Sequence, residues 1–378
     1  MKISSFKYHD EKQPGWNFAA VELYAINLFV GETGSGKTRL LNTIFDIGVF
    51  VSQGSVFKGG IWEISFEGEK ANYIWKFEGH KNIEGNGVVI SEELTEIQKD
   101  NGNQTIIIQR DKDSFVFNNT LLPKLASGTC SIFLLKEEDL ISPIYQVFSR
   151  IMRRSFTDEA IKVPLAYASV PAELEEELGK KKSLDLMTKY QLPVSLKLFF
   201  LKKYFNPLYV EICSFYKSIF PVIEHCEILD ASILDKHLPL TGRVPVFTIK
   251  EKHVKSPIPL QELSAGMQKV LLIMTDIIAL PPNSLYLIDE YENSLGINAI
   301  DFLPSFLADH GLDKQFVITT HHPYLINNMP IDNWQVFHRK GSNVTIKNGS
   351  EYVERFGQSK QKAFVQLIND PFFSEGLE

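Results

Sequence analysis

Residues 31–38 have the types and the spacing of a loop that binds phosphate groups. They read Gly-Glu-Thr-Gly-Ser-Gly-Lys-Thr and lie between an apolar stretch, Leu23 to Val30, and a helical pattern, Arg39 to Val51. In such a loop, glycines let backbone N–H groups converge on a phosphate, a lysine neutralises phosphate oxygens and a threonine hydroxyl binds Mg²⁺. A surface turn could carry the same letters, but rarely between a buried strand and an amphipathic helix. The residues predicted to bind nucleotide here are Gly31, Thr33, Gly34, Ser35, Gly36, Lys37, Thr38 and Arg39.

Two carboxylates near the other end of the chain complement this loop. Asp289 and Glu290 directly follow the apolar stretch Tyr286 to Ile288, which is the pattern of a Walker B strand. A strand that ends in Asp-Glu is common, and alone it describes a solvated turn equally well. Together with the phosphate-binding loop it predicts a division of roles. Asp289 would share Mg²⁺ with Thr38, while Glu290 would orient and polarise an attacking water.

An α/β architecture is needed to bring these distant residues together. Apolar strands followed by helical segments predict a mostly parallel sheet flanked by helices, and ligands bind at the carboxyl ends of such strands. The stretch Phe316 to Thr320 is a further such strand, and it ends at His321. Two hairpins after the first helix predict a small antiparallel β lobe. The strands expected outside the parallel core are Lys2 to Tyr8, Gly60 to Phe66, Asn72 to Phe77, Gln104 to Arg110, Asp113 to Asn118, Glu227 to Leu234 and Val244 to Lys250.

A helical insertion separates the two halves of the predicted nucleotide-binding head. The pattern is helical from about Leu135 to Val222 and includes the amphipathic run Val194 to Phe220. This insertion is too short for the many heptads of a long coiled-coil arm. We therefore expect three segments: an N-terminal half-head at 1–134, the insertion at 135–222 and a C-terminal half-head at 223–378.

Composition limits the classes of partner. The 378 residues include 39 Lys and Arg against 46 Asp and Glu, a net charge of −7, so no global positive field attracts nucleic acid. Three scattered cysteines are too few for a disulfide framework, which favours a reducing compartment. No run of about eighteen apolar residues and no N-terminal targeting pattern is present. We expect a cytoplasmic protein that does not enter a membrane.

The segment Leu263 to Lys269 opens an amphipathic helix and carries a resemblance to a known family. It reads Leu-Ser-Ala-Gly-Met-Gln-Lys, and it resembles the signature of ABC-type ATPases of the SMC, RecF and OLD group, which begins Leu-Ser-Gly-Gly. Ala265 stands where the family has its first glycine. The resemblance implies that Ser264, Gly266 and Gln268 bind the ATP held by an opposite protomer. The alternative is a serine that simply caps a buried helix.

Two further segments occupy the family's order after the Walker B strand. Residues 292–296, Glu-Asn-Ser-Leu-Gly, are similar to the D-loop, which couples two nucleotide sites across a dimer. Residues 319–326 are similar to the switch-histidine segment, which implies that His321 contacts the γ-phosphate. We expect His322 to have a capping or core role instead of a catalytic one. The histidine pair lacks a third ligand with the spacing of a metal site.

Two family elements are harder to place in this sequence. The resemblance implies a Q-loop glutamine near the metal, and Gln109 is the candidate, with a solvated hairpin glutamine as the alternative. An early basic residue that stabilises the triphosphate is also expected, and Lys7 is the available residue in the first strand. The match otherwise covers residues 1 to about 130 and 223 to about 348.

The resemblance implies a compact ATPase that closes head to tail as a homodimer around two ATP molecules with Mg²⁺. Relatives of this form often regulate a separate effector, such as a nuclease, in bacterial anti-phage defence, with slow ATP hydrolysis. Nucleic acid would then be reached through the partner or the insertion. One alternative is a RecF-like DNA-repair ATPase that uses Arg150, Arg153 and Arg154, expected on one helical stretch. The other is a nonenzymatic scaffold that holds nucleotide as a structural ligand.

Overall fold

The computed structural model describes residues 1–10, 15–54, 59–123, 127–155, 165–189, 192–235, 242–293, 295–356 and 360–376. The chain forms two compact units. The first unit comprises residues 1–153, 283–289 and 313–378, and the second comprises 154–282 and 290–312. The three-segment division expected from the motifs stays a prediction, because compactness groups residues by contact and not by their place in the chain.

The centre of the first unit is a set of short apolar strands. β3 (Ile26–Val30), β14 (Leu285–Ile288) and β15 (Gln315–Thr319) are buried along almost their whole length, as strands covered on both faces must be. β14 pairs with β15, and β15 with β3, all in parallel, and β3 continues to β16 (Trp334–Lys340) in parallel. The predicted α/β fold is confirmed. The sheet is mixed, with parallel pairs in this central region and one further parallel pair between β17 (Asn343–Asn348) and β2 (Asn17–Glu22).

The same sheet continues into a long antiparallel region. Among the described residues it has fourteen strands in the order β10-β14-β15-β3-β16-β17-β2-β1-β4-β5-β6-β7-β8-β9. Both predicted hairpins are confirmed, since β4 pairs with β5 and β7 pairs with β8 in antiparallel register. The bounds of the remaining strands are β1 Lys2–His9, β2 Asn17–Glu22, β4 Gly60–Glu67, β5 Ala71–Lys81, β6 Gly87–Gln98, β7 Gln104–Arg110, β8 Phe115–Phe117, β9 Thr120–Leu121, β10 Ile151–Arg154 and β17 Asn343–Asn348.

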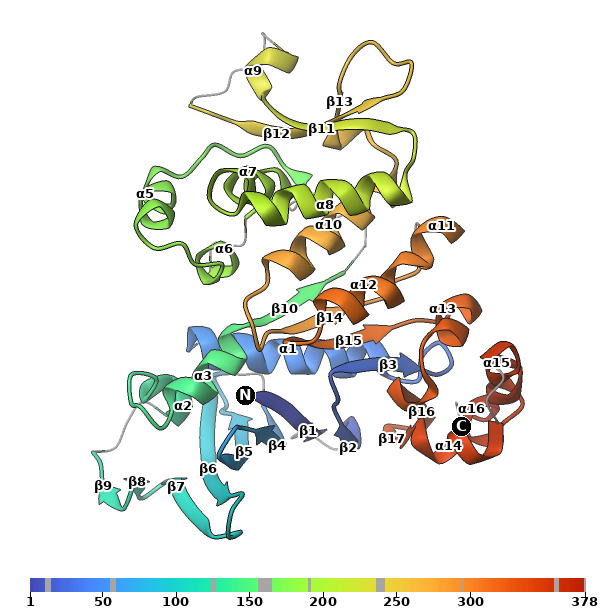
Figure 1. Ribbon diagram of the computed structural model, residues 1–378. Helices are drawn as coiled ribbons and strands as arrows, with labels where there is room; N and C mark the ends of the chain where they lie inside the picture. The colour runs from blue at the N-terminus through green and yellow to red at the C-terminus, as the bar shows by residue number, and fades with distance from the viewer. Residues whose placement is uncertain are drawn as a thin grey trace. The chain divides into compact units, whose positions relative to one another are not determined.

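Helix α1 (Lys37–Gln53) includes the last two residues of the phosphate-binding loop and packs on this sheet (Figure 1). Its buried residues recur every three or four positions, at Leu40, Ile44, Ile47 and Val51, so one stripe of the helix faces the core. That core also holds Trp62 and Phe77 of the antiparallel strands, stacked at 4.0 Å between ring centroids. The other helices of the unit are α2 Ser131–Leu134, α3 Ser142–Ser149, α13 Pro323–Asn328, α14 Ser350–Phe356, α15 Lys360–Ile368 and α16 Pro371–Ser374.

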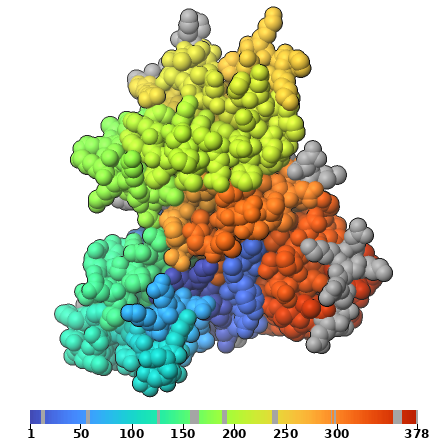
Figure 2. Space-filling view, viewed as in Figure 1, coloured from blue at the N-terminus to red at the C-terminus, as the bar shows by residue number. Residues whose placement is uncertain are grey.

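The second unit is built on helix α10 (Ala265–Ala279), of which eleven residues are buried. Helices α7 (Val194–Tyr204) and α8 (Asn206–Ile219) pack against it and against each other. Figure 1 shows the strands β11 and β12 beside these helices, and Figure 2 shows the continuous surface that α7 to β12 form, in green to yellow. The other elements are α5 Ala172–Lys180, α6 Asp185–Lys189, β11 Ile223–Asp230, α9 Ala231–Leu234, β12 Pro245–Glu251, β13 Ile258–Pro259, η1 Leu260–Glu262, α11 Ile297–Ile300 and α12 Phe302–His310.

The helical insertion departs from its predicted pattern at two places. The run Val194 to Phe220 is two helices, because Pro207 at the start of α8 cannot continue the preceding helix. The predicted helical stretch with three arginines is wrong. Arg150 ends α3, while Arg153 and Arg154 lie on strand β10. A strand of four residues is too short to show an alternating pattern, so it could not be distinguished from the helical sequence around it.

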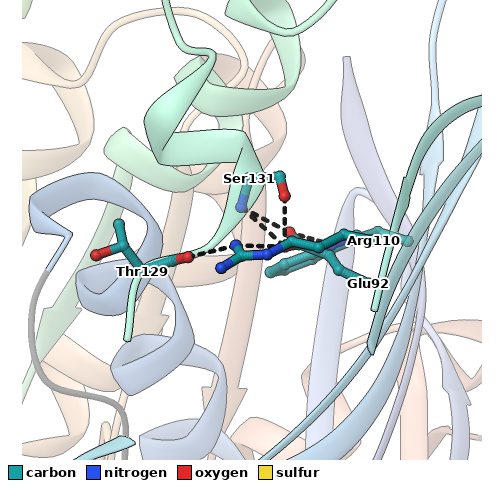
Figure 3. A network of polar contacts seen from close by, with 5 residues as sticks. Glu92, Arg110, Thr129 and Ser131 are labelled. Atoms are coloured by element: carbon teal, nitrogen blue, oxygen red, sulfur yellow. Dashed lines mark hydrogen bonds and ion pairs between the residues drawn. The ribbon is translucent and has the colours of Figure 1, made fainter. Parts of the chain in front are cut away.

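Strand β6 was missed by the sequence analysis because acidic residues interrupt its alternation. One of them, Glu92, is 1% exposed and lies at the centre of a polar network (Figure 3). Its carboxylate accepts the backbone N–H of Ser131 at 2.8 and 3.0 Å, the Ser131 hydroxyl at 2.8 Å and the Trp75 indole N–H at 3.1 Å. Arg110 lies 3.7 Å away and donates to the Thr129 carbonyl. Burial raises the pKa of Glu92, and Ser131 and Arg110 oppose that rise.

We expect Glu92→Ala to lower the free energy of unfolding of the first unit by about 3–5 kcal/mol, because it leaves buried donors without their acceptor. The four tryptophans of the chain, Trp16, Trp62, Trp75 and Trp334, all lie in this unit, so tryptophan fluorescence during urea unfolding reports on it. The control is Glu93→Ala, which removes only a surface pair with Lys76 and should cost about 0–1 kcal/mol. Equal losses for both variants would contradict the structural role of the network.

Candidate functional site

The phosphate-binding loop has the backbone that its glycines allow. Gly34 and Gly36 have φ angles of 90° and 103°, in the left-handed region that side chains disfavour. Gly31 has no room for a side chain, since a Cβ there would lie 2.9 Å from the Phe337 carbonyl oxygen. The first turn of α1 has no side-chain cap, so its N–H groups and the positive end of the helix dipole could bind an anion.

Lys37 places a positive charge inside this loop. Its Nζ donates to the carbonyl oxygens of Gly31 at 2.7 Å and Glu32 at 2.9 Å, and to the Ser35 hydroxyl at 3.3 Å. The residue is only 4% exposed. The ammonium group is therefore held by the loop that it would help to close around a phosphate. Thr33 and Arg39 lie exposed on the rim of the same loop.

Asp289, directly after β14, contacts the end of the phosphate-binding loop. Its Oδ1 accepts the Thr38 hydroxyl at 3.0 Å and the Thr319 hydroxyl at 2.9 Å. Its Oδ2 lies 3.3 Å from Nη2 of Arg153. Hydroxyl and carboxylate oxygens fit Mg²⁺, which takes few protein ligands and completes its shell with phosphates and water. The described residues contain no group of three His, Cys, Asp or Glu that could hold a different metal.

Two residues near the loop were missed by the sequence analysis. Arg339 on β16 donates to the Gly34 carbonyl at 3.0 Å, and its guanidinium lies 4.3 Å from the Trp16 ring. Arg39 lies 4.6 Å from the same ring. No motif marks Trp16 or Arg339, because the contacts join segments more than 300 residues apart. These three side chains put an aromatic surface and two positive charges beside the loop.

The structure does not bring Gln109 to the predicted metal ligands. Gln109 is exposed on β7 and pairs with Glu93 and Val116 in the antiparallel region. In the strand order β7 is eight places from β3, which leads into the phosphate-binding loop. We therefore leave Gln109 out of the proposed magnesium site. Lys7 is likewise exposed, on β1.

In the second unit, Ser264 stands at the start of helix α10. It is exposed and caps the helix, with its hydroxyl accepting the Met267 N–H at 3.4 Å. Gly266 is half-buried. The Gln268 carboxamide donates to the carbonyls of Leu260 and Gln261 at 3.0 and 3.1 Å, so this side chain fixes the turn before Ser264.

Glu290 follows Asp289 in the chain and has an unusual backbone. Its φ is +48°, which costs a non-glycine residue about 1–3 kcal/mol. Lys269 on α10 donates to the Glu290 carbonyl at 3.2 Å and to the Asn293 carbonyl at 2.6 Å, and the Asn293 amide donates to the Glu290 carboxylate. Burial lowers the pKa of Lys269 to about 7, against the opposing charges of Glu292 and Glu290. Ser294 of the predicted D-loop lies outside the described residues.

A second buried charge lies further along α10. Asp276 is fully buried and accepts from Arg154 at 2.5 Å and from Lys197 of α7 at 2.6 Å. Burial alone would raise the pKa of Asp276, but these two cations lower it to about 2. The signal in the sequence is one acidic residue inside a long apolar helix. Asp276 therefore connects helix α10 to Arg154 and to helix α7.

The two histidines after β15 have different environments. His321 is exposed and follows Thr319 and Thr320 at the carboxyl end of the strand. His322 caps α13, where its Nδ1 accepts the Tyr324 N–H at 3.3 Å. The expected capping role of His322 is confirmed.

Comparison with known proteins agrees with the ATPase motifs. Residues 189–327 match the family described as "AAA domain, putative AbiEii toxin, Type IV TA system". No curated protein matches the sequence. Among the described residues, no helix is long and apolar enough to span a bilayer.

Solved structures similar to the chain include heads of SMC proteins. One is the SMC head domain from Thermotoga maritima, at 11% identity and a TM-score of 0.40, over 92% of this chain and 99% of that one. Another is the Smc head domain with an extended coiled coil bound to the C-terminal domain of ScpA, derived from Pyrococcus furiosus, at 11% identity and 0.48, over 94% and 98%. A third is an Smc head bound to the C-winged helix domain of ScpA, at 11% and 0.46, over 92% and 98%.

The buried ammonium of Lys269 predicts a pH dependence of stability. The pKa of Lys269 is about 7 in the folded protein against 10.5 as its ordinary value, so between these pH values the unfolded chain binds the extra proton. Stability therefore gains with rising pH in this window, by at most about 1.4 kcal/mol per pH unit. Lys269→Met lacks the titrating group and so lacks this gain. The free energy of unfolding of the parent should therefore rise relative to that of the variant as the pH increases above 7.

Urea unfolding followed by far-ultraviolet circular dichroism at several pH values measures this difference. The matched control is Lys255→Met, an exposed lysine of the same unit, which should leave the pH dependence of the parent unchanged. A pH-independent difference between the parent and Lys269→Met would show that Lys269 stays protonated throughout.

Proposed function

We propose that this chain, whose residues 189–327 match an AAA-type ATPase family, binds and hydrolyses ATP with Mg²⁺ as an ABC-type head. The observation that carries the proposal is the hydrogen-bonded group of Thr38, Asp289 and Thr319. It joins the end of the phosphate-binding loop to the carboxylate after β14, where a metal and a triphosphate need adjacent ligands.

The residues predicted for the site have separate roles in the proposed reaction. The loop amides and Lys37 bind the β- and γ-phosphates, and Thr38 and Asp289 hold Mg²⁺, which draws charge from the phosphate oxygens. Glu290 accepts a proton from the attacking water, and His321 contacts the γ-phosphate at the end of β15. The exposed carboxylate of Glu290 and the exposed ring of His321 support these roles, because both are accessible to a ligand.

The proposed active form is a head-to-tail homodimer around two ATP molecules. Ser264 and the uncapped remainder of the first turn of α10 would bind the γ-phosphate held by the partner copy. The exposure of Ser264 supports this, since a buried serine could not contact a second chain. The D-loop after Glu290 would connect the two sites, as its contact with Lys269 on the signature helix favours.

We further propose that dimer closure regulates a separate effector protein, such as a nuclease, in bacterial anti-phage defence, with slow ATP turnover. The family description of a putative AbiEii toxin in a type IV toxin–antitoxin system supports this setting. The surface of the insertion, visible in Figure 2, would be the part that follows closure. Direct binding of DNA is less well supported, because Arg153 and Arg154 lie in ion pairs and the net charge is −7.

Glu290→Gln should trap the ATP-bound dimer. The amide cannot accept the proton of the attacking water, so phosphate release should fall by about 10²–10⁴-fold while ATP binding remains. Light scattering coupled to size-exclusion chromatography with ATP and Mg²⁺ should show a dimer. Lys37→Ala is the control that should bind no ATP and stay monomeric. A monomeric Glu290→Gln protein at saturating ATP and Mg²⁺ would rule out dimer closure, and absent phosphate release from the parent would favour a scaffold.

Ser264→Arg should separate ATP binding from dimerisation. A long cation at the exposed start of α10 blocks a partner's phosphate site but leaves the protein's own loop unchanged. Combined with Glu290→Gln, the variant should bind ATP as a monomer in the same chromatography. Ser218→Arg, at an exposed serine of α8, is the matched control and should dimerise as Glu290→Gln alone does. A dimer of the Ser264→Arg double variant would place the interface elsewhere.

A further inference from the structure

Arg153 lies at the nucleotide site although no predicted motif includes it. Strand β10 is next to β14 in the sheet, and the Arg150 carbonyl accepts the Leu285 N–H at 3.2 Å, where β14 begins. Arg153, three residues after Arg150, donates to the carboxylate of Asp289, which directly follows β14. The two strands therefore run in the same direction, and Arg153 lies at the carboxyl edge, where ligands of a parallel sheet bind.

The contact between Arg153 and Asp289 occupies one side of the carboxylate. Oδ1 of Asp289 accepts the hydroxyls of Thr38 and Thr319, and Oδ2 faces Nη2 of Arg153 at 3.3 Å. The Asp289 side chain is only 8% exposed, so its charge needs a cation nearby. Arg153 supplies that cation.

The guanidinium of Arg153 has a donor that makes no hydrogen bond among the described residues. Nε of Arg153 is buried and has no hydrogen-bond partner among the described residues, and Nη2 is its donor to Asp289. The side chain is 24% exposed, so it is neither fully enclosed nor free in solvent. A buried donor without a partner costs about 1–3 kcal/mol, and a planar guanidinium is suited to two oxygens of one phosphate.

We propose that Arg153 is a phosphate-binding residue of the ATP site, a role that rests on the proposed function. Without nucleotide, Arg153 neutralises Asp289. With Mg²⁺ held by Asp289, the guanidinium and the metal would repel each other, and Arg153 would donate instead to oxygens of the triphosphate. Arg153 thus remains a cation of the site in both states and exchanges one anion for another.

The alternative is that Arg153 only neutralises Asp289 until the metal arrives. Binding at saturating Mg²⁺ distinguishes the two, because a neutralising group competes with the metal whereas a phosphate-binding group helps the nucleotide. We expect Arg153→Gln to weaken binding of a fluorescent ATP analogue by at least about tenfold at saturating Mg²⁺, since a charged hydrogen bond is worth about 1.5–3 kcal/mol. Equal or tighter binding than the parent would overturn the proposal.

Two further variants and one competitor sharpen this test. Arg153→Lys keeps the charge but not the planar fork, so its affinity should lie between those of the parent and Arg153→Gln. Arg150→Gln changes the net charge equally three residues away and should bind within about twofold of the parent. Inorganic tripolyphosphate should displace the analogue from Arg153→Gln only at concentrations raised by a similar factor, because the lost contact is with phosphate. An unchanged tripolyphosphate affinity would overturn the proposal.

Measurements without nucleotide separate a folding defect from a binding defect. Arg153→Gln should keep the far-ultraviolet spectrum of the parent, and Arg153→Lys serves if the glutamine variant does not fold. The parent and Lys37→Ala test the proposed function independently. If the parent does not bind ATP, the proposed function fails; if it binds and Arg153→Gln binds equally well, only the role of Arg153 fails.

Discussion

The proposed nucleotide site depends on the contacts of one side chain, the carboxylate of Asp289. One of its oxygens holds two hydroxyls, from the start of α1 and from the end of β15, and the other faces the guanidinium of Arg153. Three strands and one helix therefore meet at one almost buried negative charge. A charge in that position is stable only with partners, and in the ATP-bound protein Mg²⁺ and phosphate groups would take part in that balance.

The two carboxylates of the predicted Walker B motif, Asp289 and Glu290, belong to different compact units. The chain passes from the first unit to the second between Asp289 and Glu290, and again between Arg153 and Arg154. On the side of the first unit, Arg153 and Asp289 contact each other. In the second unit, helix α10 contacts the next residue of each pair. Asp276 forms an ion pair with Arg154, and Lys269 donates to the carbonyl of Glu290. The helix that carries Ser264 thus contacts the residues that directly follow Arg153 and Asp289 in the chain.

Buried charges in the second unit have a cost that the helix packing must offset. Asp276, Lys197 and Lys269 are each at most 3% exposed, and each is held by specific polar partners. Such groups contribute little net stability but disfavour alternative packings in which their partners are absent. These buried charges therefore favour one position of helix α10 relative to helix α7 and to residues 290–293, because α10 contacts both through them.

The sequence by itself determined the parts of the site that depend on local chemistry. Residues 31–38 need only their own glycines to form a phosphate-binding turn, and apolar runs that end in Asp289 and His321 define strand ends at one edge of a sheet. The antiparallel hairpins were likewise visible in alternating residues. His322 was expected to have a capping or core role, and it caps helix α13.

Only the tertiary structure decided which residues from distant segments meet. Arg153 was expected on a helix, and its place beside Asp289 follows from the pairing of β10 with β14, which no local pattern encodes. Gln109 matched in residue type but lies far along the sheet, since strand order is set by long-range packing. Glu92, Asp276 and Arg339 were missed for the same reason. From sequence alone, a charged residue is predicted to lie on the surface. Its burial becomes favourable only when the folded chain places a polar partner beside it.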